Sequence, residues 1–282
     1  MSMKKDSAMG ARAFRGRSLP NFILLLFSLS IPVWIIGAAY DVQLFPGFKL
    51  FQLPLAMPAV AALILSFRES GRGGVTALLK RTYDFRRIRP GAWYLPIFLI
   101  YPSIGLLDVL IQRLMGTSIP SPRFSIIALI GYSTVFFLTF GEELGLTGYA
   151  ISALQERHSA LVSGVILGLL WASYHIPGFI ISGYYSYDWV VWHSLYIIAG
   201  RVLFVWVYNN SGKSLFSMAL FHSTFGVFWI LWPQAENLQK TPPVYDPRIA
   251  ALVTVSYVAI VTLLWGAKTL TQFRLVRPPA VD

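Results

Sequence analysis

The chain has 282 residues, of which 56% are hydrophobic and only 12% are charged, and its formal net charge is +11. About a quarter of the residues in a soluble domain carry charge, so this composition excludes an ordinary soluble domain and indicates a protein that lies in a bilayer. The chain has no cysteine, which excludes disulfides, thiolate metal sites and a cysteine nucleophile.

About eight apolar stretches are long enough to cross the hydrocarbon core, which takes about 20 helical residues. Strand-like alternation is absent, and a helix satisfies its own backbone hydrogen bonds in lipid. We therefore predict an all-α fold, a polytopic transmembrane helical bundle. In chain order the expected spans are 20–40, 50–67, 93–111, 124–154, 161–176, 189–208, 215–232 and 249–265.

Basic residues border these spans unevenly. They cluster before residue 20, between 68 and 89, and after residue 267, whereas the loops at 41–49 and 178–188 contain few. The positive-inside rule then places both termini in the cytoplasm. With no internal repeat or soluble domain in view, we predict a basic cytoplasmic tail at 1–19, one transmembrane domain at 20–267 and a second basic tail at 268–282. Anionic membrane lipids, and no nucleic acid, are the expected partners of this charge.

Glu142 and Glu143 stand next to each other in the fourth span, with apolar sequence on both sides. Ionisable groups inside a bilayer are costly and usually functional, although the pair would be inert if it marked a hydrated helix end. If the following turn lies near residues 157 and 158, Glu142 and His175 both lie roughly 22 to 26 Å from it along adjacent helices. We therefore expect the carboxylate and the imidazole to face each other within the membrane.

Neighbouring helical residues point about 100° apart, so one glutamate should face a cavity and the other a partner. A carboxylate in an apolar cavity can act as a general base for water, with His175 and His222 sharing the water or stabilising an oxyanion. The same four residues, Glu142, Glu143, His175 and His222, would also suit a divalent metal such as zinc, although no His-Glu-x-x-His spacing occurs. No cofactor is required by the glutamate chemistry. Ser173 lies near His175, but no acidic residue is placed to orient a serine triad.

Three short motifs occur in order along these hydrophobic helices. They are Glu-Glu-Leu-Gly-Leu-Thr-Gly at 142–148 with Leu-Gln-Glu-Arg at 154–157, Trp-Ala-Ser-Tyr-His-Ile-Pro at 171–177, and Ser-Leu-Phe-Ser-Met-Ala-Leu-Phe-His at 214–222 after Trp-Val-Tyr-Asn-Asn-Ser-Gly. Together they resemble the CAAX protease and bacteriocin-processing family (CPBP, or Abi), which includes the Ras-converting CAAX endopeptidase. The resemblance covers 139–229, in a core at about 124–232.

The resemblance implies an intramembrane endopeptidase in which Glu142 activates the hydrolytic water with His175. It further implies that His222 helps to hold the oxyanion and that Glu143 orients or tunes the site. Trp171 matches the aromatic residue four positions before the second-motif histidine. The family is described as using glutamate without an obligatory metal, and its eukaryotic members remove the last three residues of prenylated proteins.

The sequence departs from the family pattern at two positions. Thr147 stands where the first motif has an arginine, and Gly226 stands where an asparagine follows the third-motif histidine. The arginine would pair with the second glutamate, and the asparagine would donate to an oxyanion. Arg201 is the only Arg or Lys well inside the sixth apolar stretch. We therefore predict that Arg201 pairs with Glu143, unless its side chain snorkels or lines a hydrated groove.

Two main hypotheses follow. The first is a peptidase that hydrolyses a bond in a membrane-associated protein or peptide, located in a bacterial cytoplasmic membrane. The second is a catalytically weakened relative that binds a membrane partner as an immunity or maturation factor, which the changes at Thr147 and Gly226 favour. A proton-coupled carrier is a third reading, although neither inverted repeats nor pairs of broken helices are evident. The oligomeric state is not encoded in these patterns.

Overall fold

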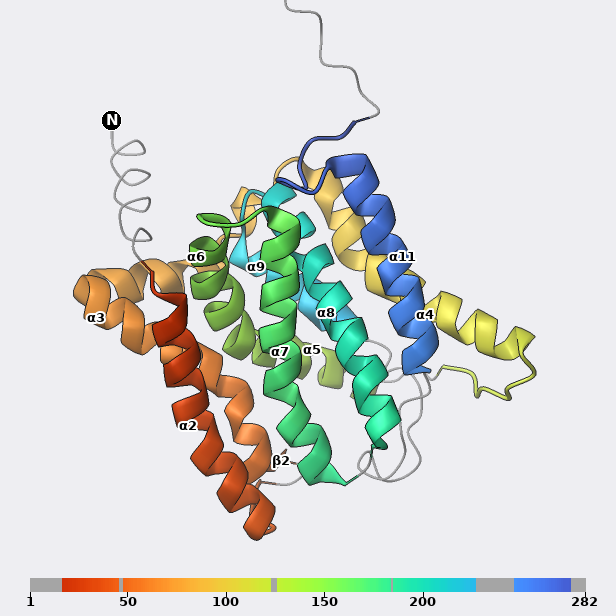
Figure 1. Cartoon of the computed structure of the whole chain (residues 1–282), viewed down its shortest axis with the longest axis horizontal. Helices are drawn as coiled ribbons and strands as arrows, with labels where there is room; N and C mark the ends of the chain where they lie inside the picture. The colour runs from red at the N-terminus through yellow and green to blue at the C-terminus, as the bar shows by residue number, and fades with distance from the viewer. Residues whose placement is uncertain (1–16, 46–47, 123–125, 184, 227–245, 275–282) are drawn as a thin grey trace, which may run out of the picture.

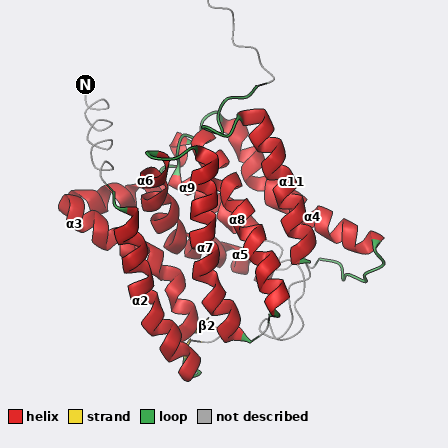
Figure 2. Ribbon diagram, in the orientation of Figure 1, coloured by secondary structure: helices red, strands yellow, loops and turns green. Residues whose placement is uncertain are grey.

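The computed structural model describes residues 17–45, 48–122, 126–183, 185–226 and 246–274 (Figure 1). Nearly all of this part is helical, as Figure 2 shows, so the predicted all-α polytopic bundle is confirmed. A short antiparallel hairpin, β1 (Gln43–Phe45) and β2 (Phe48–Lys49), is an addition to the prediction. The tails expected at 1–19 and 268–282 fall largely outside the described residues.

Six helical stretches are long and apolar enough to cross a membrane, and they match six of the expected spans. They are α2 (Leu19–Ala39), η1 and α3 (Leu50–Ala56 and Met57–Lys80), α4 (Tyr94–Leu114), α7 (Ala160–Ser182), α8 (Tyr187–Asn210) and α11 (Pro247–Trp265). The seventh expected span begins as α9 (Leu215–Phe225), an apolar helix of 11 residues, and the rest of 215–232 lies outside the described residues.

The fourth expected span is not one continuous α-helix. It consists of α5 (Ile126–Gly145), a π-helical turn η5 (Leu146–Ala150) and the short α6 (Ile151–Gln155). The carbonyl of Gly148 in this turn accepts hydrogen bonds from both Arg17 and Arg81. Turns of this kind within α-helices are often found at functional sites, and this one directly follows the two glutamates.

The segment at 68–89, which we expected to be a loop, is mostly helical. Helix α3 continues through it to Lys80, with a kink at Gly71 where φ is +59°, and short 3₁₀ turns follow (Arg81–Tyr83, Phe85–Arg87 and Gly91–Trp93). The clustered arginines indicated a polar segment, which we took for a loop. An amphipathic sequence can also form a helix, and α3 does so up to Lys80.

Helix α8 forms the centre of the bundle and packs between α7 and α11. In the 18-residue apolar stretch of α8, 72% of the residues are buried, against 22% in the corresponding stretches of α2 and α11. Gly164 and Gly168 let α7 approach α8 closely, because a Cβ atom there would come within 2.8 and 2.7 Å of the backbone at Val202 and Ile198. Helix α5 packs on α3 and α9, and Glu142 on α5 contacts Trp171 on α7, so all three motifs meet in one interior region.

Candidate active site

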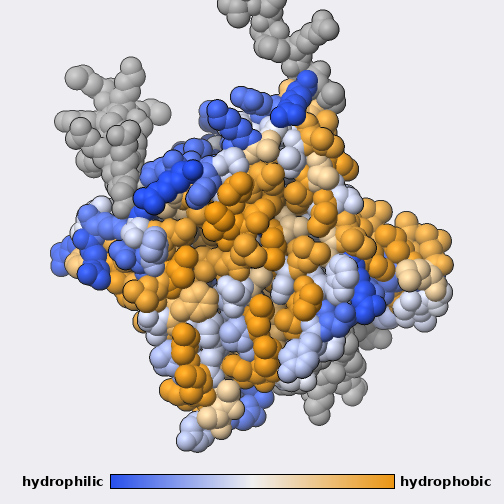
Figure 3. Space-filling view, in the orientation of Figure 1, coloured by the Kyte–Doolittle hydropathy of each residue, from blue (hydrophilic) through white to orange (hydrophobic). Residues whose placement is uncertain are grey.

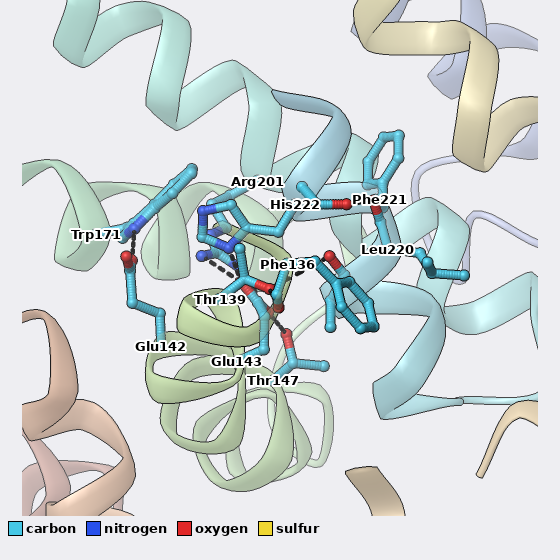
Figure 4. A network of polar contacts seen from close by, with 12 residues as sticks. Phe136, Thr139, Glu142, Glu143, Thr147, Trp171, Arg201, Leu220, Phe221 and His222 are labelled. Carbon is cyan, nitrogen blue, oxygen red and sulfur yellow. Dashed lines mark hydrogen bonds and ion pairs between the residues drawn. The ribbon is translucent and has the colours of Figure 1, made fainter. Parts of the chain in front are cut away.

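Glu143 lies at the centre of a fully buried polar cluster (Figure 4). Its Oε1 forms an ion pair with Arg201 at 2.8 Å and accepts a hydrogen bond from Nδ1 of His222 at 2.8 Å. Its Oε2 accepts from Arg201 at 3.0 Å and from the hydroxyl of Thr147 at 2.5 Å. Four donors therefore surround this carboxylate, which leaves it little capacity to activate a water molecule.

Arg201 takes the place of the arginine that the first motif lacks. It pairs with Glu143 as predicted, and neither side chain is exposed. Its guanidinium carbon lies 3.8 Å from the ring centre of Trp171 and 4.4 Å from that of Phe204, so aromatic faces cover the charge that Glu143 neutralises. Thr147, at the motif position, donates a neutral hydrogen bond to Glu143.

Glu142 points away from this cluster, as Figure 4 shows. Its Oε2 accepts from the indole nitrogen of Trp171 at 2.5 Å and lies 3.7 Å from Nε2 of His175. The turn between α6 and α7 lies at 156–159, as expected from the sequence. Glu142 and His175 therefore face each other, and the two glutamates have different surroundings, as the 100° offset predicts.

A cavity of about 370 Å³ opens in front of Glu142 and His175. It is bounded by α2, by η1 and by the second half of α7, and neither Glu143 nor His222 lines it. Polar side chains from Lys49, Gln52 and Ser182 also line it, between apolar walls. A space of this size accommodates a peptide side chain or a small ligand beside the carboxylate.

The four candidate metal ligands separate into two pairs, Glu142 with His175 and Glu143 with His222. Across the described parts of the chain, no three His, Asp or Glu side chains converge as they would around a metal ion. The hydroxyl of Ser173 donates to the carbonyl of Leu170, so it serves the helix backbone.

Gly226 ends α9, and its backbone N–H contacts the carbonyls of Ser223 and Thr224. A Cβ atom at this position would lie 3.3 Å from a methyl group of Val135, which is a tight contact. A larger residue, such as the family's asparagine, would therefore have little free space at position 226. No side-chain donor from Gly226 reaches the cluster around His222.

Several residues of the site were not found from the sequence alone. The indole N–H of Trp171 was not anticipated as a hydrogen-bond donor to Glu142, and the cavity walls formed by Gln52 and Lys49 lie about 90 residues from Glu142 in sequence. Arg17 and Arg81, expected only as topology signals, bind the π-helical turn beside the site. Only the tendency of buried arginines to seek carbonyl groups would have pointed to them.

Comparison with known proteins adds an independent line of evidence. Residues 124–228 match a family model described as Type II CAAX prenyl endopeptidase, Rce1-like, and this segment contains all three motifs. CAAX prenyl protease 2 of Methanococcus maripaludis is 27% identical over 221 residues, which cover 71% of this chain and 80% of the archaeal protein. Over this segment the chain is therefore similar to the Rce1-like CAAX prenyl endopeptidases, which supports a peptidase and confirms the resemblance read from its motifs.

Proposed function

We propose that the chain is an intramembrane endopeptidase in which Glu142 activates water for attack on a peptide bond of a membrane-associated protein or peptide. The observation that carries this proposal is the division of labour between the two glutamates. Glu143 is surrounded by donors, whereas Glu142 lines the cavity with His175 and has one oxygen held by Trp171. The general base is therefore Glu142.

The tautomer of His175 decides which of its ring nitrogens can accept a hydrogen bond from the water molecule. Its Nδ1 lies 2.9 Å from the carbonyl oxygen of Trp171, and a carbonyl only accepts, so Nδ1 carries a proton. In the neutral ring, Nε2 is then an acceptor that faces Glu142 Oε2 at 3.7 Å. A water molecule that donates one hydrogen to each acceptor would turn its lone pairs towards the substrate.

The reaction follows from this arrangement. The water oxygen bonds to the carbonyl carbon while its proton passes to Glu142, and the carbonyl oxygen becomes an oxyanion. Glu142 then returns the proton to the amide nitrogen as the carbon–nitrogen bond breaks, which releases an amine and a carboxylic acid. The carboxylate of Glu142 is regenerated, so atoms and charge balance over one turnover.

His222 serves the oxyanion under one condition. Its Nδ1 donates to Glu143, so Nε2 can donate a second hydrogen bond only when the ring carries both protons. The carboxylate of Glu143 contacts that ring, and the same carboxylate forms an ion pair with Arg201. We therefore assign Glu143 and Arg201 a positioning role, in which they fix the orientation of His222.

Trp171 should support catalysis through its indole N–H. A hydrogen bond to a charged group contributes roughly 1.5 to 3 kcal/mol, so Trp171→Phe is expected to lower kcat by about 10- to 100-fold. Trp206→Phe is the matched control, because the buried indole nitrogen of Trp206 has no hydrogen-bond partner among the described residues. Equal losses of kcat in the two variants would contradict a specific role for the Trp171 N–H.

A binding relative without turnover is the second candidate. The observation that favours it is the missing side-chain donor at Gly226, because His222, the other third-motif residue assigned to the oxyanion, does not line the cavity. Loss of one oxyanion donor typically slows an enzyme by about 10²- to 10³-fold. A proton-coupled carrier would instead show Glu142-dependent flux in proteoliposomes.

The direct test is cleavage of a pool of membrane-associated peptides by the purified protein in detergent. The pool includes prenylated peptides, because the archaeal relative is named a prenyl protease. We expect new termini to appear, with one solvent oxygen incorporated per cleavage, and equal cleavage by Ser173→Ala. A chelator arm measures any dependence on metal. Absence of cleavage by the well-folded protein across the whole pool would favour the binding relative.

A further inference from the structure

The π-helical turn η5 is held from outside its own helix by two arginines. Nη1 of Arg17 donates to the carbonyl oxygen of Gly148 and, at 3.1 Å, to that of Tyr149. Nη1 of Arg81 donates to the same Gly148 oxygen at 2.9 Å. A carbonyl oxygen has two lone pairs, so these two donors use its full capacity. Arg17 stands just before α2 and Arg81 directly after α3, so the turn is tied to two helices that are distant in sequence.

Each arginine makes further contacts that fix its side chain. Nη2 of Arg81 donates to the hydroxyl of Tyr208 on α8 at 2.8 Å. The guanidinium carbon of Arg17 lies 4.6 Å from the ring centre of Tyr149. That ring stacks on Phe22 of α2, with 5.4 Å between the ring centres. The turn is therefore connected to α2 through Arg17 and to α8 through Arg81.

Burial distinguishes these two arginines from others of the basic segments. Figure 3 shows hydrophilic surface at the end of the bundle where α2 begins, and Arg68 and Arg86 are exposed. Arg17 and Arg81, in contrast, are only 6% and 8% exposed. Burial, and then the charge of Arg81, lower the pKa of Arg17 to about 10, which leaves it charged at neutral pH. Two cations beside one oxygen repel each other, and the partial negative charge at the carboxyl-terminal end of α5 offsets this repulsion.

The turn sets the direction in which the end of α5 faces. A π turn accommodates one residue more than an α turn, and one helical residue corresponds to about 100° of rotation and 1.5 Å of rise. If the same residues formed a regular α-helix while α6 kept its place, the end of α5 would rotate and shift by about these amounts. Glu143 would then take the direction in which Glu142 now points, and Leu144 would take that of Glu143.

This rotation equals the angle that separates the two glutamates. With the π turn, Glu142 lines the cavity and Glu143 meets Arg201, as Figure 4 shows for the second contact. Without it, an apolar residue would face the buried guanidinium of Arg201. Glu142 would turn to the place of Gly141, where a Cβ atom comes within 3.2 Å of the carbonyl oxygen of Leu55. The different roles of the two glutamates therefore depend on the π turn.

We propose that Arg17 and Arg81 are positioning residues of the active site, which stabilise the π-helical turn and thereby keep Glu142 directed into the cavity. The effect on turnover rests on the proposed function, whereas the effect on the direction of Glu142 does not. Neither arginine lines the cavity, so both act through the orientation of α5. A displacement of about 1 Å at a catalytic group can slow a reaction by about 10²-fold.

Arg81→Gln tests the effect on turnover, with Arg86→Gln as the matched control. Arg86 is exposed in the same basic segment, so the same chemical change there should leave kcat unaltered. We expect Arg81→Gln to lower kcat by about 10- to 100-fold and to leave KM within about twofold of the native value, because the substrate is still bound beside a displaced base. Arg81→Lys keeps the charge and a donor for Gly148, so it should recover most of the loss.

The absence of cysteine allows a second measurement that needs no turnover. Glu142→Cys and Ser182→Cys each place a unique thiol at the cavity, one on α5 and one on α7. The rate at which each thiol reacts with a small thiosulfonate is measured on the purified protein in detergent. We expect Arg81→Gln, but not Arg86→Gln, to slow the thiol at position 142 by about tenfold or more, because the rate follows the fraction of molecules in which that thiol faces the cavity. The rate at position 182 should not change.

The two measurements distinguish positioning from a general loosening of the fold. An unchanged or faster reaction at position 142, or equal slowing at positions 142 and 182, would overturn the proposal. If Arg81→Gln does not fold, Arg17→Gln and Tyr208→Phe decide the question by the same measurements, since each removes other contacts around the turn. If labelling is as expected but the native protein cleaves no peptide, the proposed peptidase fails while the positioning of Glu142 by the two arginines stands.

Discussion

Glu142→Gln is expected to lower kcat for peptide cleavage by about 10²- to 10⁴-fold, the range that general-base catalysis supplies. An amide has nearly the shape of the carboxylate, and its oxygen can still accept from the indole N–H of Trp171, which lies 2.5 Å from the native Oε2. It cannot remove a proton from water. The loss should therefore fall on kcat, with the melting temperature in detergent nearly unchanged.

Glu156→Gln is the matched control for this variant. Glu156 lies in the exposed turn after α6, so the same chemical change there should leave kcat and the melting temperature unaltered. Single-turnover kinetics, with a peptide from the pool that the native protein cleaves, separates the chemical step from product release. Retention of full activity in Glu142→Gln, with the control also active, would move the general base to another residue.

Much of the fold could be predicted from the sequence because the bilayer restricts the options. Long apolar stretches without strand alternation indicate helices, and six of the eight expected spans agree with the structure. The juxtaposition of Glu142 and His175 followed from helix rise and the position of one turn. The pairing of Arg201 with Glu143 followed from the cost of a lone charge among apolar residues.

The assignment of roles within the site could be predicted less fully. Sequence spacing shows that Glu142 and Glu143 diverge, but which of them faces the cavity depends on the rotation of α5 against α3 and α9. The resemblance assigned the catalytic role to Glu142, and the packing supplies a physical reason for it. The indole of Trp171 illustrates the same limit, because its N–H direction is set by a side-chain rotamer and by the ring stacking on Arg201.

Other features depend on contacts between distant parts of the chain. Arg17 and Arg81 reach the carbonyl of Gly148 across 131 and 67 residues of sequence. Their clustering with other basic residues suggested only a solvated, cytoplasmic segment. The π-helical turn itself has no sequence signal, since one extra residue in a helical turn is stabilised by its surroundings and not by local propensity.

Arg201→Gln is expected to destabilise the protein by about 3 to 5 kcal/mol, the usual cost of leaving a buried charge without its partner. Both side chains of the pair are inaccessible to solvent, so Glu143 would keep only Thr147 and His222 as donors. Glu143→Gln should cost a similar amount, because it leaves the guanidinium between aromatic rings without a counter-charge. Unfolding in detergent with a denaturant measures both losses.

The double variant Arg201→Gln/Glu143→Gln separates pairing from packing. Two neutral amides remove both unpaired charges, so the double variant should be more stable than the sum of the single losses requires. Arg248→Gln is the matched control, because Arg248 forms an exposed pair with Asp188, and its loss should not change stability measurably. Strict additivity of the two core substitutions would show that Arg201 and Glu143 contribute to stability independently. Arg201 would then not replace the motif arginine that is missing at Thr147.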